Sequence, residues 1–291
     1  DRRGVAPFRA AAAAAGWPPL LRKCTPTRCA VPRTGRYRGC MATIDLNADL
    51  GETVDGVPTA DDAALYPLLS SANVACGGHA GDETSMRAAV AHAERLGVAI
   101  GAHPSYPDRS GFGRVRLDLA EPDLRAVLVV QIAALVDAGA DLRYVKPHGA
   151  LYHAIRTDAA HARAVASAVS EVSDRLGRPL SILGQDGEIT RAASDAGLPF
   201  RREAFLDRGY LASGALVPRG QPGDLLHDGA EVAARAVRLA TEGVVLSVDG
   251  AVIRTDAVSL CIHADSPGAV MLARAARAAL DAAGVTVRAP W

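Results

Sequence analysis

Short apolar runs of small and β-branched residues recur along this chain and alternate with segments of helical periodicity. A helix is expected over 83–96, Pro122 suits the first turn of another, and Thr59 and Thr157 are candidate N-caps. The apolar runs predict strands at about 43–47, 71–75, 98–102, 143–147, 180–184, 200–204 and 257–263.

Strand and helix alternate seven times, which indicates a parallel sheet covered by helices. Units of about 35 residues suit a distorted, seven-stranded (β/α) TIM-like barrel. An open doubly wound sheet is the alternative, because strand order cannot be read from sequence. Two insertions interrupt the pattern: 104–117, a candidate lid, and 205–227, which precedes an expected hairpin at Asp249-Gly250.

Charge is distributed unevenly along the 291 residues, although the formal net charge is zero and 49% of the residues are hydrophobic. Residues 1–40 contain nine Lys or Arg residues and one acid. We expect 1–40 to be a disordered extension outside the fold, upstream of the natural start or added to it; a targeting peptide or a nucleic-acid-binding arm is the alternative. Residues 41–291 are expected to form a single barrel domain.

Cysteine content and hydropathy predict the cellular setting. Beyond residue 40 the only cysteines are Cys76 and Cys261, too few for a disulfide framework and without CxxC spacing. No segment reaches the ~18 uninterrupted apolar residues of a membrane helix. A soluble, cytoplasmic protein with no membrane and no nucleic-acid partner is therefore expected.

Polar clusters follow most of the predicted strands. They span 47–52, 73–82, 103–108, 146–149, 203–208 and 263–265. The carboxyl ends of parallel strands converge on one face, so these clusters can share one site, which favours an enzyme. Five of the eight histidines lie in or beside the clusters: His79, His103, His148, His153 and His263. His92 and His161, on helical segments, are expected at the surface.

Two of the clusters suggest particular chemistry. Asp45, Asn47 and Asp49 alternate, so they face one side of a strand, either as a site or as a structural network. The glycine-rich turn from Cys76 to Asp82 can admit a substrate carboxylate at a helix N-terminus. Cys76 itself is expected to be a packing residue rather than a nucleophile.

Lys146 is the only lysine after residue 40, in a chain that otherwise uses arginine. With His148 at the same strand end, it can polarise a carbonyl group and move a proton. A divalent metal site is a further expectation if Asp49, His79, His103 and His148 converge, although no HxxxH or HExxH spacing supports it locally.

The clusters together resemble the LamB/YcsF family, whose members act as the A subunit of the bacterial ATP-dependent 5-oxoprolinase. The resemblance runs from about residue 44 to 287 and rests on Leu-Asn-Ala-Asp-Leu-Gly-Glu, Asn-Val-Ala-Cys-Gly-Gly-His-Ala-Gly-Asp, Gly-Ala-His-Pro-Ser-Tyr-Pro-Asp, Lys-Pro-His-Gly-Ala-Leu-Tyr and Cys-Ile-His-Ala-Asp. It implies a fold similar to the distorted barrel of polysaccharide deacetylases. It also implies that 5-oxo-L-proline is opened to L-glutamate while ATP, with Mg²⁺, is hydrolysed together with subunits B and C.

The expected catalytic residues are Asp49, Glu52, His79, Lys146 and His148. The expected substrate-binding residues are Asn47, Asn73, Gly78, Asp82, His103, Arg109, Phe112, Arg114, Tyr152, Glu203, Asp207, Arg208, His263 and Asp265. No GxxxxGK[ST] loop occurs, so phosphoryl transfer is expected to be completed by the partners. The alternatives are a metal-dependent deacetylase acting without ATP and a non-catalytic subunit that only binds 5-oxoproline.

Overall fold

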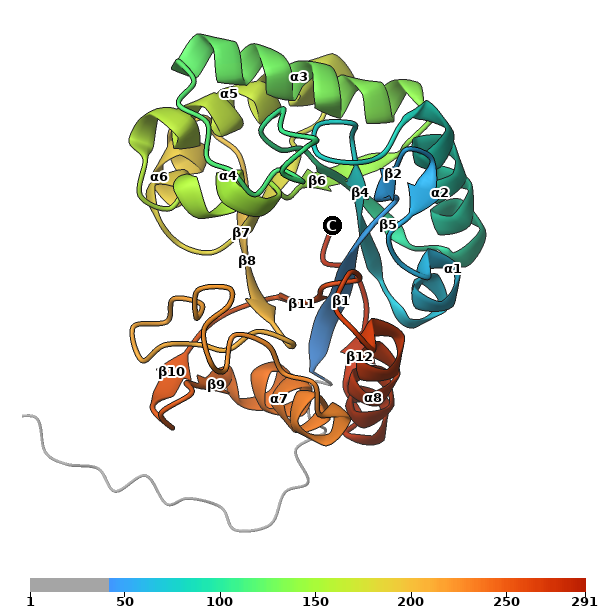
Figure 1. Ribbon diagram of the computed structural model, residues 1–291, viewed down its shortest axis with the longest axis vertical. Coiled ribbons are helices and arrows are strands. Elements are labelled where there is room, and N and C mark those ends of the chain that lie inside the picture. Colours follow the sequence, from blue (N-terminus) through green and yellow to red (C-terminus); the bar gives the residue numbers. More distant parts are fainter. Residues whose placement is uncertain (1–41) are drawn as a thin grey trace, which may run out of the picture. The chain divides into compact units, whose positions relative to one another are not determined.

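Seven parallel strands form a closed ring in the computed structural model, which describes residues 42–291 (Figure 1). In ring order they are β1 (Thr43–Leu50), β4 (Ser71–Ala75), β5 (Ala99–His103), β6 (Leu142–Val145), β7 (Ser181–Gly184), β8 (Phe200–Phe205) and β11 (Ser259–Ile262). Pairing of β11 with β1 closes the ring. The predicted seven-stranded barrel is confirmed, and the open sheet is wrong. The prediction for 1–40 lies outside the described residues.

Helices surround the ring, so the outward faces of the strands are buried (Figure 1). The longer ones are α2 (Glu83–Leu96), α3 (Glu121–Asp137), α5 (Ala159–Leu176), α6 (Glu188–Asp195), α7 (Gly229–Glu242) and α8 (Ala269–Ala282). The short ones are α1 (Asp62–Leu65), the 3₁₀ helix η1 (Tyr66–Leu68) and α4 (Gly149–Ala154). The helix predicted over 83–96 is confirmed; it ends at Gly97, which adopts a left-handed conformation.

Two predicted N-caps are wrong by one or two residues. Asp61 caps α1 and Asp158 caps α5, each through a carboxylate that accepts from main-chain N–H groups. A carboxylate is favoured there over a neutral hydroxyl because its charge also complements the helix dipole. Thr59 instead donates to the carbonyl of Glu52. His161 is buried rather than exposed, with its ring nitrogens against Tyr106 and the Leu119 carbonyl.

Two hairpins and one short strand complete the β structure of residues 42–291. The expected hairpin at Asp249-Gly250 joins β9 (Val244–Leu246) to β10 (Val252–Arg254) and is confirmed. The hairpin of β2 (Thr53–Val54) with β3 (Val57–Pro58), and β12 (Thr286–Val287), which pairs with the start of β1, were not predicted. Strands of two residues are too short to carry a periodic pattern.

A hydrogen-bonded group, here called the serine network, occupies the barrel interior near the start of the strands. Its members are Asp45, Ser70, Ser71 and Ser259, and all three hydroxyls donate to the carboxylate. The indole of Trp291 donates to Ser71 (2.8 Å) and stacks on Tyr144. This end of the barrel is therefore filled and internally satisfied.

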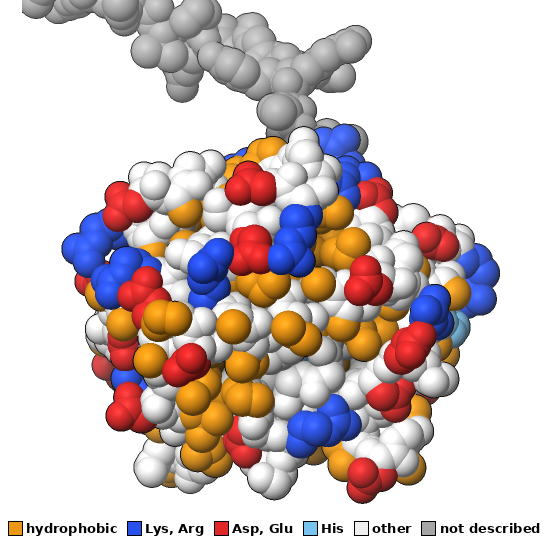
Figure 2. All heavy atoms as spheres, turned by 90° about the horizontal axis from the view of Figure 1, so that it is seen from above, with side chains coloured by type: hydrophobic (Ala, Val, Ile, Leu, Met, Phe, Trp, Pro, Cys, Tyr) orange, Lys and Arg blue, Asp and Glu red, His pale blue; other side chains and the backbone are white. Residues whose placement is uncertain are grey.

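The outer surface carries charges of both signs. Figure 2 shows acidic and basic side chains interspersed on the face seen from above Figure 1, where α3 and α5 lie. Ion pairs join these helices, from Arg125 to Glu171 and from Arg163 to Glu121, both at 2.7 Å. In residues 42–291 no helix is both long and apolar enough to cross a membrane.

Candidate functional site

A cavity of about 460 Å³ lies where the strands end, and five of the six polar clusters converge on it. Of the predicted site residues, its wall contains Asp49, Glu52, His103, Arg114, Lys146, His148, Tyr152, Arg208, His263 and Asp265. Most of these residues stand at the carboxyl end of a strand or in the segment directly after it. The expected convergence of the clusters is thus confirmed.

Lys146 lies at the floor of the cavity and is 2% exposed. Its Nζ is 3.0 Å from Asp49 Oδ1, 3.2 Å from Glu203 Oε2 and 3.0 Å from Cys261 Sγ. Burial alone would lower the pKa of Lys146, but the charges around it, that of Asp49 above all, raise it well above its usual range. An ammonium has three N–H donors, and hydrogen bonds to Asp49, to Cys261 and, at 3.5 Å, to Asn47 Oδ1 use them all, with Glu203 as a further ion-pair partner. A substrate oxygen can bind Lys146 only by replacing one of these partners.

Two asparagines support Asp49 from inside the barrel. Asn73 Nδ2 donates to Asp49 Oδ1 and to Asn47 Oδ1, both at 2.7 Å, and Asn47 Nδ2 donates to Ser259 Oγ. Burial alone would raise the pKa of Asp49, but His103 and Lys146 hold it well below its usual range. Asn47 and Asn73 therefore keep an ionised carboxylate in place and do not line the cavity.

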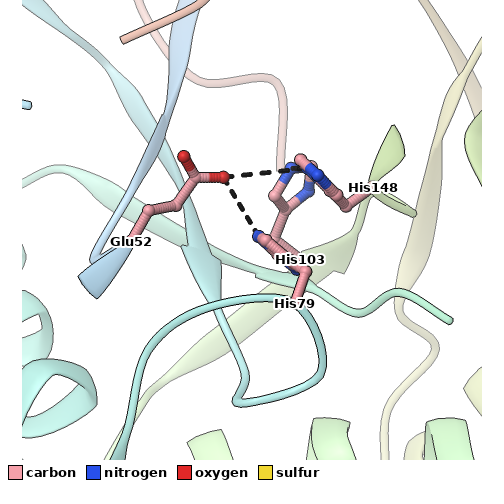
Figure 3. Close-up of side chains that lie close together, drawn as sticks. All are labelled: Glu52, His79, His103 and His148. Carbon is pink, nitrogen blue, oxygen red and sulfur yellow. Dashed lines mark hydrogen bonds and ion pairs between the residues drawn. The ribbon is translucent and has the colours of Figure 1, made fainter. Parts of the chain in front are cut away.

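Glu52, His79, His103 and His148, here called the histidine cluster, lie together beside the cavity (Figure 3). Glu52 Oε1 is 3.0 Å from His79 Nε2 and 3.7 Å from His148 Nδ1. The rings of His79 and His148 stack with centroids 3.7 Å apart. Burial raises the pKa of Glu52 to about 8 and lowers the pKa of both His79 and His148 well below the usual value. The two stacked imidazoles are thus neutral at pH 7.

The four metal-binding residues expected from the sequence differ from the histidine cluster in one residue, Asp49 in place of Glu52. Glu52 completes the group with the three histidines, whereas Asp49 lies beside it, with Oδ2 at 3.4 Å from His103 Nε2. Gly51 adopts a left-handed conformation between the two acids, so the strand alternation ends there. The turn brings Glu52 to the rings of His79 and His148.

Asp207 and His263 form a second buried pair at the cavity wall. Nδ1 of His263 is 3.0 Å from Asp207 Oδ1, and the ring stacks on Phe205. Burial alone would lower the pKa of His263, but the charge of Asp207 raises it. Within residues 42–291, Nε2 of His263 has no hydrogen-bond partner. The pair thus presents an oriented imidazole to the cavity, suited to proton transfer.

The predicted lid, 104–117, covers the histidine cluster. The carbonyl of Phe112 is 2.9 Å from His148 Nε2, and a Cβ on Gly113 would collide with His79 and His148. Arg114 forms an ion pair with Asp265 across the cavity mouth. These contacts fix where the loop lies, and its mobility stays a prediction.

The turn from Cys76 to Asp82 does not reach the cavity, contrary to expectation. Asp82 is exposed, and its carboxylate caps α2 in a capping box with Ser85. Gly78 packs against Gln131, and Arg109 donates to the carbonyls of Gly77 and Gly81. The sequence of this turn is compatible with a helix N-cap and with an anion-binding site. In the structure Asp82 forms the N-cap of α2.

Cys76 is a packing residue, as expected. It is buried, and its thiol donates to the carbonyl of Val74. Burial raises the pKa of Cys76 to about 12, so it is not a thiolate at neutral pH.

Some functional positions were not identified from sequence. Cys261 contacts the ammonium of Lys146, and Phe205 forms part of the wall.

Arg208 holds the 205–227 insertion by donating to the carbonyls of Asp224 and Val217. That insertion carries the exposed Arg219 to the cavity. Its Leu-Val-Pro-Arg sequence gives no local signal of this placement, which depends on the path of the loop.

Tyr152 lies in the cavity wall, and Glu203 lies behind the wall beside Lys146. Glu203 is buried and forms an ion pair with Lys146. Burial and the charge of Glu203 raise the pKa of Tyr152 well above its usual value. In the described chain the Tyr152 hydroxyl has no hydrogen bond of normal geometry.

Comparisons with known proteins agree with this fold and identify its family. The sequence model described as the LamB/YcsF family matches residues 44–290. The A subunit of a 5-oxoprolinase from Paracidovorax citrulli is 47% identical over 249 residues, covering 84% of this chain and 98% of that relative. The one from Kocuria rhizophila is 47% identical over 252 residues, with 85% and 99% covered. A solved lactam utilization protein from Thermus thermophilus is 42% identical, has a TM-score of 0.79 and covers 85% of this chain and 99% of its own.

Proposed function

Because the chain belongs to the LamB/YcsF family, we propose that it is the A subunit of an ATP-dependent 5-oxoprolinase. It opens the ring of 5-oxo-L-proline to give L-glutamate, while ATP is hydrolysed to ADP and phosphate. The observation that carries the proposal is the cavity, where an ionised carboxylate, an oriented imidazole and an arginine without a carboxylate partner among residues 42–291 meet. The lactam utilization protein and the relatives named as A subunits of 5-oxoprolinase support this substrate class.

The substrate is a small carboxylate, and the cavity offers it a cation. Arg219 lies exposed at the wall, and the described residues supply no carboxylate partner for it. Arg114, in contrast, is paired with Asp265. Arg219 therefore binds the carboxylate of 5-oxoproline in this proposal, in place of the turn before α2.

The chemistry must overcome an unstrained amide. Phosphorylation of the lactam oxygen would make C5 open to attack by water. The C5–N bond would then break with a proton delivered to nitrogen, and the acyl phosphate left on C5 would be hydrolysed to give L-glutamate and phosphate. His263, oriented by Asp207, is placed to accept and return protons. Asp49 is a poor base because its pKa is low, and it stabilises the positive charge of Lys146 at the cavity floor.

Subunits B and C are the proposed partners, and the complex is proposed to act in the cytoplasm. This chain lacks a GxxxxGK[ST] loop, so the partners complete the binding of ATP with Mg²⁺ and the phosphoryl transfer. The chain described here contributes the lactam site.

Reconstitution with purified subunits B and C tests the proposal. Glutamate release from 5-oxoproline with ATP should require this chain. His263→Asn and Lys146→Arg should each lower kcat by ~10²–10³, because proton transfer or the preorganised ammonium is lost. Guanidinium is larger and planar, so it cannot take the place of the ammonium between Asp49 and Glu203.

The matched control is His92→Asn, a histidine on α2 outside the cavity, which should retain full activity. If the complex forms glutamate without this chain, the assignment is wrong. If both cavity variants keep normal rates, the chain is a binding subunit without a catalytic role.

A further inference from the structure

The ring nitrogens of His103 and His148 face each other in an arrangement that two neutral imidazoles cannot satisfy. His103 Nδ1 is 2.7 Å from the Lys146 carbonyl, and His148 Nε2 is 2.9 Å from the Phe112 carbonyl. A carbonyl oxygen only accepts hydrogen bonds, so both of these nitrogens carry the proton. The opposite nitrogens, His103 Nε2 and His148 Nδ1, then carry lone pairs, yet they are only 2.9 Å apart. A positive charge is needed beside them.

The other two members of the histidine cluster surround the same point. Ligand atoms of all four side chains lie within 4.8 Å of one another (Figure 3). Bonds of ~2.0–2.2 Å to a central ion place tetrahedral ligands about 3.3 Å apart. The separations of 2.9, 3.0 and 3.7 Å within the cluster bracket that value.

We propose that Glu52, His79, His103 and His148 bind one divalent transition-metal ion. Three imidazole nitrogens and one carboxylate oxygen suit Zn²⁺, Fe²⁺, Co²⁺, Ni²⁺ or Mn²⁺, whereas Ca²⁺ and Mg²⁺ prefer oxygen ligands throughout. The inference depends on these four residues alone and stands apart from the proposed 5-oxoprolinase activity.

The surroundings of the cluster are those of a metal site. Main-chain carbonyls fix the tautomers of His103 and His148, the usual second contact of a metal-binding histidine. All four side chains are buried, so water does not compete for the lone pairs. Glu52, His103 and His148 also line the cavity, which gives the ion an open side toward a bound molecule.

The competing explanation is a proton shared between His103 and His148. It accounts for the 2.9 Å separation equally well, but it assigns no role to Glu52 and predicts no metal affinity. Binding of the metal alone, without substrate or partner subunits, separates the two.

The experiment uses the full chain, stripped with a chelator and titrated with Co²⁺. Visible d–d absorption should saturate at one Co²⁺ per chain, and Zn²⁺ should displace it. Glu52→Gln and His103→Asn should each weaken binding at least about 10-fold. Asp207→Asn and His263→Asn change the same cavity outside the cluster and should bind as the wild type does.

Circular dichroism and melting temperature establish that each variant is folded, and Glu52→Gln keeps the size of the native side chain. Absence of a Co²⁺ spectrum in the wild type overturns the proposal, as does equal binding by Glu52→Gln and His103→Asn. Failure of 5-oxoprolinase activity alone leaves it intact.

Discussion

The barrel contains two buried polar groups that differ in how completely they are satisfied. In the serine network, Asp45 accepts from three hydroxyls, and Ser71 in turn accepts from Trp291. In the histidine cluster, His103 Nε2 and His148 Nδ1 face each other at 2.9 Å although the other nitrogen of each ring lies against a carbonyl, and Nδ1 of His79 has no partner within residues 42–291. Buried polar groups normally find hydrogen-bond partners, so the first group is explained as structure and the second as a place for a bound ion.

The largest expected difference is the response to metal. Zn²⁺ at about 100 times its Kd should raise the free energy of unfolding of chelator-treated protein by about 2.7 kcal/mol, because the ion binds only the folded state. Glu52→Gln should remove at least about 1.3 kcal/mol of this gain, as expected for binding at least about 10-fold weaker, and Ser259→Ala should keep it. Urea unfolding with and without Zn²⁺ measures both. A gain that survives Glu52→Gln would place the ion elsewhere.

The next test compares a hydrogen-bonded hydroxyl of the serine network with a buried hydroxyl near Lys146 that has no well-formed hydrogen bond within residues 42–291. Ser259→Ala should lower the free energy of unfolding by about 2 kcal/mol, since Asp45 loses a donor and Asn47 loses an acceptor. Tyr152→Phe removes a buried hydroxyl with no well-formed hydrogen bond, so the change should stay within about 0.5 kcal/mol. Urea unfolding at pH 7 compares them, and equal losses would contradict the distinction.

The two buried acids should also affect stability over different pH ranges. Burial raises the pKa of Asp45 from 3.8 to about 6 and that of Glu52 from 4.5 to about 8. In both cases the folded state holds the proton more tightly, so the stabilisation is complete below the ordinary pKa. This stabilisation is lost as pH rises through the pKa of the folded state. The free energy of unfolding then falls by up to about 1.4 kcal/mol per pH unit for each group.

Isosteric amides isolate the two contributions in metal-free protein. The difference between wild type and Asp45→Asn should change mainly between about pH 4 and 6. The difference for Glu52→Gln should continue to change up to about pH 8. Unfolding curves across this range give both differences, and identical profiles would mean that the two sites do not differ in protonation.

Sequence predicted most of the barrel because its strands are apolar runs bounded by clear turns. The seven strands and α2 carry that pattern over four or more residues, whereas β2 and β3 have two each and carry none. The convergence of the polar clusters also followed from the parallel topology.

The details of the site depended on contacts that sequence does not encode locally. Glu52 and Asp49 lie three residues apart, and the conformation of Gly51 decides which of them meets the histidines. Arg219 reaches the cavity through the path of a long loop, and Asp82 is used by its own helix. Tertiary geometry determined each of these outcomes.

The closing seam of the ring has a consequence for how the protein is made. Asp45 in β1 pairs with Ser259 in β11, a separation of 214 residues. During synthesis β1 leaves the ribosome before the other strands of the ring, and this edge stays unpaired until β11 has emerged. Such non-local pairing is slow, and an exposed strand edge favours aggregation. We therefore expect the yield of folded protein to be sensitive to chaperones and to the rate of translation while this seam forms.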